Sequence, residues 1–249
     1  MNWEVPRIWE GGDVWILGGG PSVTKQFDIP DTLVQEVMNG VSPPSIYSPY
    51  MEVIHKKHVI GINSAYLIGT WIDMVFFGDN KFFLPHKDRL AAWPGLKVTC
   101  HDGIKGYDWV KFLGRDGNHP KGITPNPNMI SWNAHSGGAA ISVAANAGAK
   151  RIILLGFDMT LNGNGEKNWH KLYAEEPTSV VPAGRRGQPR DPRKSLPFHK
   201  HLLGFPYIAK DARMRGIEII NISPDSAIVE FPKMTLKEFL NNESTNNKL

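Results

Sequence analysis

The 249-residue sequence lacks several features that would define its class. Its single cysteine, Cys100, excludes an internal disulfide and a cage of thiolate metal ligands. No apolar run approaches the roughly 18 residues of a membrane-spanning helix. The first residues include acids and tryptophans where a secretory signal has a basic start and an apolar stretch. The net charge of +4 is too small to indicate a nucleic-acid partner. We therefore expect a cytoplasmic protein without a membrane span.

Short apolar runs alternate along the chain with segments of helical character. Several runs are apolar throughout, which is typical of parallel strands covered by helices on both faces. This alternation predicts an α/β fold, a single Rossmann-like doubly wound domain over residues 1–240 with a mainly parallel sheet and a flexible tail over 241–249. The expected strands are 14–17, 59–62, 74–77, 97–100, 151–155 and 218–222, and the expected helices are 81–93, 136–147 and 198–215.

Three segments interrupt this alternation. Residues 41–50 and 114–128 are rich in turn-forming residues, so we expect loops there. Residues 161–197 are too long and polar for a simple connection, and we expect a lid-like insertion. Its basic residues could pair with a bound diphosphate, bind an acidic surface or remain solvated. They are Arg185, Arg186, Arg190, Arg193 and Lys194.

Three glycines follow the first expected strand, in the sequence LGGGPSV. Small residues at the end of a parallel strand allow backbone amides to approach an anion, so Gly18, Gly19, Gly20 and Ser22 are candidate contacts to phosphate or ribose. The alternative is a tight turn that binds no ligand. Val23 stands where a dinucleotide fingerprint has its third glycine, and no phosphate-binding Lys-Ser/Thr pair follows. Neither NAD binding nor a P-loop is therefore supported.

A second candidate region begins at Ser136, before an alanine-rich helix. Ser136 is the expected N-cap, and Ser136 and Gly137 are candidate phosphate contacts. The alanines could equally serve helix propensity and packing. Asp79 and Asp158 end two other strands at the same edge of the sheet. They could hold magnesium or a sugar hydroxyl, or each could cap a loop.

Four segments resemble one superfamily: GGGPSV, GINSAY, SGGAAISVAANAGAKRIILLGFDM and IEIINISPDSAI. They resemble the bacterial sialyltransferases that modify surface lipooligosaccharide. They also resemble the related domain of motility accessory factors and archaeal 6-hydroxymethylpterin diphosphokinases, and phage and prophage proteins. The resemblance covers residues 14–231. It implies a nucleotide-binding fold in the cytoplasm of a bacterium or a phage-infected host cell.

The resemblance to sialyltransferases implies roles for particular residues. Asn63 and the turn of Gly19, Gly20, Pro21 and Ser22 would hold the nucleotide, and Ser136 with Gly137 would contact its phosphate. The general base of that family corresponds to His199. His201, two residues later, remains open as the functional histidine, and FHKH could instead be a solvated helix start.

The same comparison shows departures from the sialyltransferase pattern. The two tyrosines that assist the leaving phosphate correspond to Thr160 and Glu166, so Lys171, Tyr173 or the basic residues of the insertion would have to serve instead. In the diphosphokinase branch, Asp73 and Asp79 with Asp158 and His170 imply magnesium and a nucleoside triphosphate. Asp158 and His170 are therefore further catalytic candidates, and Asp79 and Asp158 are candidate metal ligands.

These observations favour a nucleotide-dependent transferase. The leading hypothesis is a sialyltransferase-like glycosyltransferase that takes a CMP-type sugar and a glycan or small-molecule acceptor and requires no metal. One alternative is a magnesium-dependent diphosphokinase that acts on a hydroxymethylpterin-like compound. Another is a non-catalytic phage accessory protein. A homo-oligomer is compatible with each of these hypotheses.

Overall fold

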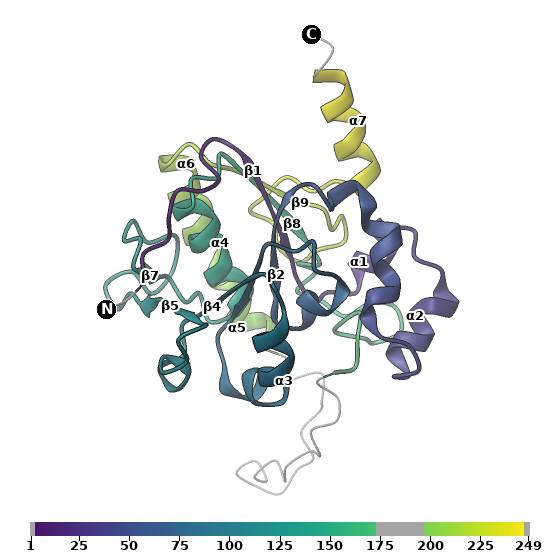
Figure 1. Cartoon of the computed structure of the whole chain (residues 1–249). Coiled ribbons are helices and arrows are strands. Elements are labelled where there is room, and N and C mark those ends of the chain that lie inside the picture. The colour runs from purple at the N-terminus through teal and green to yellow at the C-terminus, as the bar shows by residue number, and fades with distance from the viewer. Residues whose placement is uncertain (1–2, 173–196, 247–249) are drawn as a thin grey trace, which may run out of the picture.

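A computed structural model describes residues 3–172 and 197–246 (Figure 1). Its central sheet has seven strands in the order β5-β4-β3-β2-β1-β8-β9, and every neighbouring pair is parallel. The strands are β1 (Asp13–Leu17), β2 (His58–Ile62), β3 (Met74–Phe77), β4 (Leu96–Thr99), β5 (Lys111–Phe112), β8 (Arg151–Leu155) and β9 (Glu218–Asn221). A separate parallel pair joins β6 (Gly114–Arg115) and β7 (Met129–Ile130). The predicted α/β class and parallel sheet are confirmed.

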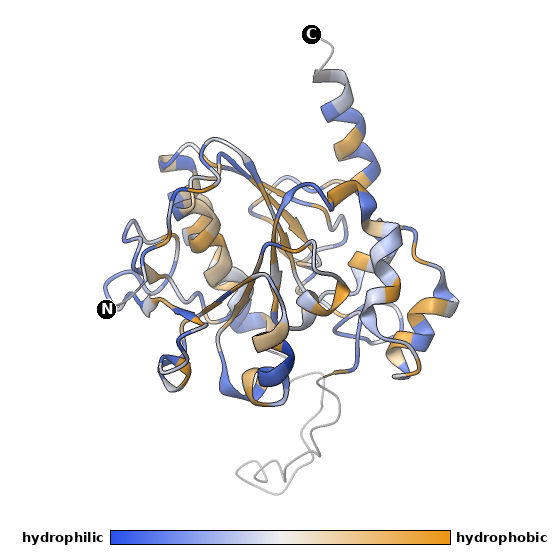
Figure 2. Ribbon diagram, viewed as in Figure 1, coloured by the Kyte–Doolittle hydropathy of each residue, from blue (hydrophilic) through white to orange (hydrophobic). Residues whose placement is uncertain are grey.

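Helices cover both faces of this sheet. Alternate residues of β1 point to opposite faces, so that Val14 and Ile16 belong to one hydrophobic cluster and Trp15 and Leu17 to the other. The first cluster includes α4 (Ser136–Asn146) and α6 (Phe205–Met214). The second includes α1 (Ser22–Gln26), α2 (Asp31–Met38), α3 (Asn80–Ala92), α7 (Leu236–Asn246) and the 3-10 helices η1 (Pro44–Ile54), η2 (Asn63–Ile68) and η3 (Asp102–Ile104). Figure 2 shows the resulting concentration of hydrophobic residues on the strands.

Helix α4 lies unusually deep in the molecule. All of its residues are buried, and its small side chains let it approach β1, β2, β3 and β8. Its N-terminus reaches the carboxyl edge of the sheet. Strand β1 has β2 on one side and β8 on the other, so the chain reverses its direction of winding between β1 and β8. In open α/β sheets, ligands bind outside the carboxyl ends of the strands at such a switch point.

Three helical segments differ from the sequence prediction. The helix expected over 198–215 is two helices, α5 (Phe198–Leu202) and α6, because Pro206 has no backbone N–H and starts a new helix. Within the loop expected over 41–50, the helix η1 begins at Pro44 and continues to Ile54, and its Tyr47 and Met51 are fully buried. Helix α7 extends through residues that were expected to form a tail. Its Glu243 accepts two hydrogen bonds of 2.6 Å from Arg151 at the start of β8.

The first part of the expected lid, residues 161–172, is anchored in the core. Trp169 is 1% exposed, its indole N–H donates to Gly18 O at 3.0 Å, and its amide donates to Gly19 O at the same distance. The five basic residues of the insertion and Tyr173 lie outside the described residues. None of the helices within 3–172 and 197–246 combines the length and apolar character needed to cross a bilayer.

Candidate functional site

A cavity of about 330 Å³ lies at the switch point, between the carboxyl edge of the sheet and the start of α4. The ends of β1, β2, β3 and β8 all contribute to its wall. Six of the predicted binding residues line it: Gly18, Gly19, Asn63, Asp79, Ser136 and Gly137. The glycine turn after β1 and the N-terminus of α4 therefore face one common space, as the leading hypothesis requires.

The three glycines have different tasks. The amides of Gly18 and Gly20 donate to Leu155 O (2.8 Å) and Gly156 O (3.0 Å), which fastens the turn to the end of β8. A Cβ on Gly20 would overlap the Asp158 carboxylate. No described residue accepts a hydrogen bond from the amide of Gly19, which lines the cavity. Of the three amides, that of Gly19 is the one left to contact a ligand.

Gly20, Pro21 and Ser22 do not line this cavity. Pro21 and Ser22 face a second cavity of about 330 Å³ on the other side of the turn, together with Asp158. The Ser22 amide donates to Asp158 Oδ2 at 3.3 Å, and the Ser22 hydroxyl lies 2.8 Å from that of Ser223. Asp158 is 6% exposed. Burial raises the pKa of its carboxyl group, although hydrogen bonds from Ser22 lower it. Asp158 therefore stabilises the glycine turn from the side of the second cavity.

Asp79 and Asp158, the candidate metal ligands, are not brought together. Asp79 lines the first cavity and is the N-cap of α3, where its Oδ1 accepts a 2.7 Å hydrogen bond from the Phe82 amide. Asp158 lines the second cavity. Within the described part of the chain, no three histidine, cysteine, aspartate or glutamate side chains form a group that could hold a metal ion. Asp79 thus caps helix α3, and Asp158 accepts from the amide of Ser22 at the start of α1.

The N-cap of α4 is His135, so the prediction that Ser136 is the cap is wrong by one residue. His135 Nδ1 accepts a hydrogen bond from the Gly138 amide at 3.1 Å. His135 is 9% exposed, and burial, followed by the charge of His201, lowers the pKa of its ring to about 3. Ser136 is instead the first residue of the helix, and its amide has no acceptor within the helix.

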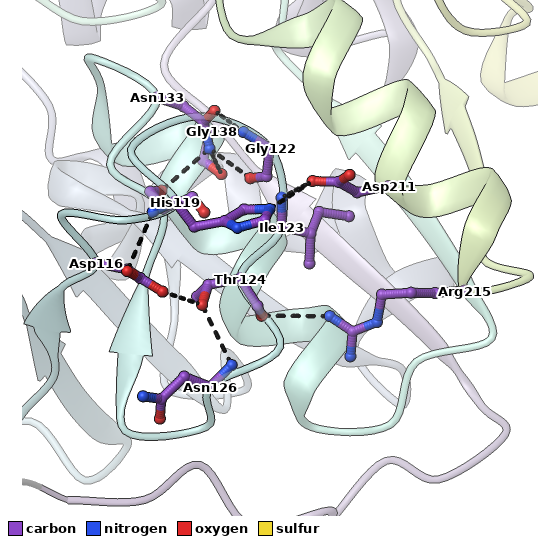
Figure 3. Close-up of polar contacts among 11 residues, drawn as sticks. Asp116, His119, Gly122, Ile123, Thr124, Asn126, Asn133, Gly138, Asp211 and Arg215 are labelled. Carbon is purple, nitrogen blue, oxygen red and sulfur yellow. Dashed lines mark hydrogen bonds and ion pairs between the residues drawn. The ribbon is translucent and has the colours of Figure 1, made fainter.

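Asn133 holds the segment before α4 in place (Figure 3). Its Oδ1 accepts from the Gly122 amide at 2.7 Å, and its Nδ2 donates to Gly122 O (2.9 Å) and Gly138 O (3.2 Å). Its φ of 51° is in the left-handed region. Asp211 of α6 accepts from the Ile123 amide at 2.8 Å and fixes the same loop from the other side. These bonds orient the first turn of α4 toward the cavity.

Of the two candidate base residues, His201 lines the cavity. His199, on the same short helix α5, is exposed and is not part of the lining. The His201 ring lies against that of His135, with centroids 4.7 Å apart. Burial, followed by the charges of Lys167 and His199, lowers the pKa of His201 to about 4. At neutral pH His201 is therefore an unprotonated imidazole that can accept a proton.

His170 lies outside the cavity at the switch point. It is 4% exposed and, with Lys171, lines a different cavity. Its Nδ1 accepts from the Leu172 amide at 3.2 Å, and its ring packs edge-on against Trp169. Burial and the charge of His86 lower its pKa to about 3. The structure gives His170 a place in the core beside Trp169.

The cavity includes two functional candidates that the sequence did not single out, Lys167 and Trp132, and one that it did, Asn63. Lys167 supplies the one lysine among the lining residues, and burial lowers its pKa. Trp132 forms part of the wall, and the guanidinium of Arg115 stacks 4.0 Å from its ring centroid. Asn63 has a φ of 50°, and its buried Oδ1 has no partner among the described residues. Its unpaired oxygen is a signal that only coordinates reveal.

Fold and cavity together define a Rossmann-like α/β protein with a ligand-sized space at its switch point. Among solved structures, the sialyltransferase CstII from Campylobacter jejuni, in complex with the substrate analogue CMP-3FNeuAc, is similar. The similarity covers 90% of this chain and 86% of that chain, with a TM-score of 0.45 and 14% sequence identity. No protein-family model matches the chain. No curated protein matches it either.

Proposed function

We propose that the chain is a transferase that uses a sugar activated by a nucleoside monophosphate, as in a sialyltransferase-like reaction with a CMP-type donor. The observation that carries this proposal is the cavity at the switch point, where the amide of Gly19 faces the N-terminal amides of α4. Helix N-termini and glycine turns bind phosphate through backbone N–H groups. The nucleotide would lie across the carboxyl ends of β1 and β8.

The charge of the cavity supports this class of donor. Its lining has one lysine, Lys167, and one carboxylate, Asp79. A phosphodiester that links a nucleoside to a sugar carries a single negative charge, which one lysine and a helix N-terminus can balance. A nucleoside triphosphate carries about four negative charges, and enzymes balance these charges with Mg²⁺ and several cationic groups. The separation of Asp79 and Asp158 into two cavities does not favour the diphosphokinase alternative.

The proposed chemistry assigns one step to each group. His201 takes the proton from an acceptor hydroxyl as the oxygen attacks the anomeric carbon of the sugar, and the bond from that carbon to the phosphate oxygen breaks. The charge that develops on the departing nucleotide is stabilised by the amides of Gly19, Ser136 and Gly137 and by Lys167. Lys167 would then do part of the work that tyrosines do in the sialyltransferases.

A binding and turnover series tests this proposal. We expect CMP to bind with unchanged affinity in EDTA and in Mg²⁺, and ATP to bind more weakly than CMP under both conditions. His201→Asn should retain CMP binding and lose turnover of a CMP-sugar at least a hundredfold. His199→Asn, on the same helix but outside the cavity, is the matched control and should remain active. Absence of CMP binding, or ATP binding that requires Mg²⁺, would contradict the proposal.

A further inference from the structure

The ring of His135 carries a hydrogen-bond donor that the described residues leave unused. Because Nδ1 accepts from the Gly138 amide, the proton of the neutral ring is on Nε2. Nε2 is buried, and no described residue is its hydrogen-bond partner. Buried polar groups are nearly always paired in folded proteins, and an exception calls for a specific explanation. A donor of this kind beside a cavity has a natural partner in a bound acceptor.

Its position next to the start of α4 indicates which acceptor. His135 lines the same cavity as Ser136 and Gly137, the first two residues of an 11-residue helix. The amides of these two residues have no acceptor within the helix, and the helix dipole favours an anion there. We propose that His135 is an anion-binding residue, whose Nε2–H donates to a phosphate oxygen of the bound nucleotide. This inference rests on the proposed function, because it assigns the phosphate of that donor to this place.

The two stacked histidines then have separate roles. The protonated Nε2 of His135 has no free lone pair, so this atom serves neither as a base nor as a metal ligand. His201 keeps the role of the base. The His201 ring lies against that of His135, with centroids 4.7 Å apart and ring planes inclined by 30°, and it does not accept a hydrogen bond from Nε2. Loss of the His201 ring should therefore leave phosphate binding intact, whereas loss of the His135 ring should weaken it.

Calorimetric titration of variants with CMP and with cytidine tests these roles. In His135→Asn the asparagine can still cap α4 and accept from the Gly138 amide, but the imidazole N–H is lost. We expect the Kd for CMP to rise about tenfold or more, as for a lost hydrogen bond to a charged group. The Kd for cytidine, which has no phosphate, should stay within about twofold. His201→Asn is the matched control and should bind CMP as the wild type does. Equal binding of CMP by wild type and His135→Asn would overturn the inference.

A measurement on the unaltered protein removes the dependence on a variant. Long-range ¹H–¹⁵N spectra of histidine report which ring nitrogen carries the proton. We expect the proton of His135 on Nε2, and a change in its ¹⁵N shift when CMP is added but not when cytidine is added. A proton on Nδ1, or no response to CMP that binds, overturns the inference and leaves the proposed function standing. If the wild type binds no CMP, both the inference about His135 and the proposed function are wrong.

Discussion

Acidification tests the role of His201 in a way that depends on its surroundings. A histidine with the ordinary pKa of about 6.5 is only about 9% unprotonated at pH 5.5, whereas one with a pKa near 4 is about 97% unprotonated. Burial and the charges of Lys167 and His199 lower the pKa of His201 to about 4. A base in this environment therefore stays active in acid, and kcat/KM for a CMP-sugar should be nearly constant from pH 7.5 to pH 5.5.

The first measurement is an NMR titration of the protein without substrate. The ¹³Cε1 and ¹Hε1 shifts of His201, assigned with His201→Asn, should titrate with a midpoint well below 6. Lys167→Met removes a nearby positive charge, so the midpoint should move upward, and kcat/KM should start to fall at a higher pH than in the wild type. A midpoint near 6.5 in the wild type, or no effect of Lys167→Met, would refute the assignment of His201 as a base kept neutral by its surroundings.

The remaining predictions concern stability. Gly20→Ala should lower the free energy of unfolding by about 2 kcal/mol, because its Cβ would overlap the Asp158 carboxylate. In Gly19→Ala the new Cβ would meet only the Asn168 side chain, so the loss of unfolding free energy should be smaller. Urea denaturation of the two variants measures this difference. Glu243→Gln should cost about 0.5–1 kcal/mol by removing a partly exposed ion pair with Arg151, a loss that thermal unfolding in high salt would conceal. Four histidines with lowered pKa values are held neutral in the fold, so the unfolded chain binds more protons than the folded chain as the pH falls below 6.5. The urea concentration at the midpoint of unfolding should therefore decrease between pH 6.5 and 5. A constant midpoint would contradict those pKa values. These histidines are His86, His135, His170 and His201.

Most of the sheet could be predicted because its strands are short apolar runs. The expected bounds for β3 and β8, 74–77 and 151–155, agree with the structure, and those of the other four expected strands differ by one residue at one or both ends. Strand β5 was missed because its two residues are too few to show a pattern. Similarly, the apolar spacing within 44–54 was hidden by prolines, although buried Tyr47 and Met51 explain why η1 forms there.

The site could be predicted as a region but not as a set of side chains. The carboxyl ends of parallel strands share one edge, which is why Gly18, Gly19, Asn63 and Asp79 could be placed together. The directions of side chains beyond a strand end depend on the local turn, so Asp158 could not be assigned to the opposite cavity.

Preferences for residue types explain other errors at the site. Serine is the commoner N-cap, and this preference concealed the capping by His135. Lys167 was missed because it lies in a segment of asparagines and glycines that resembles an ordinary loop. His201 could be distinguished from His199 only once the residues that line the cavity were known.

A crystal structure of the protein with CMP tests the central claim most directly. We expect the phosphate in the cavity at the switch point, within hydrogen-bonding distance of the amides of Gly19 and Gly137, and not bound to His201. Nucleotide in the cavity beside Ser22 and Asp158, or a phosphate remote from the first turn of α4, would contradict it.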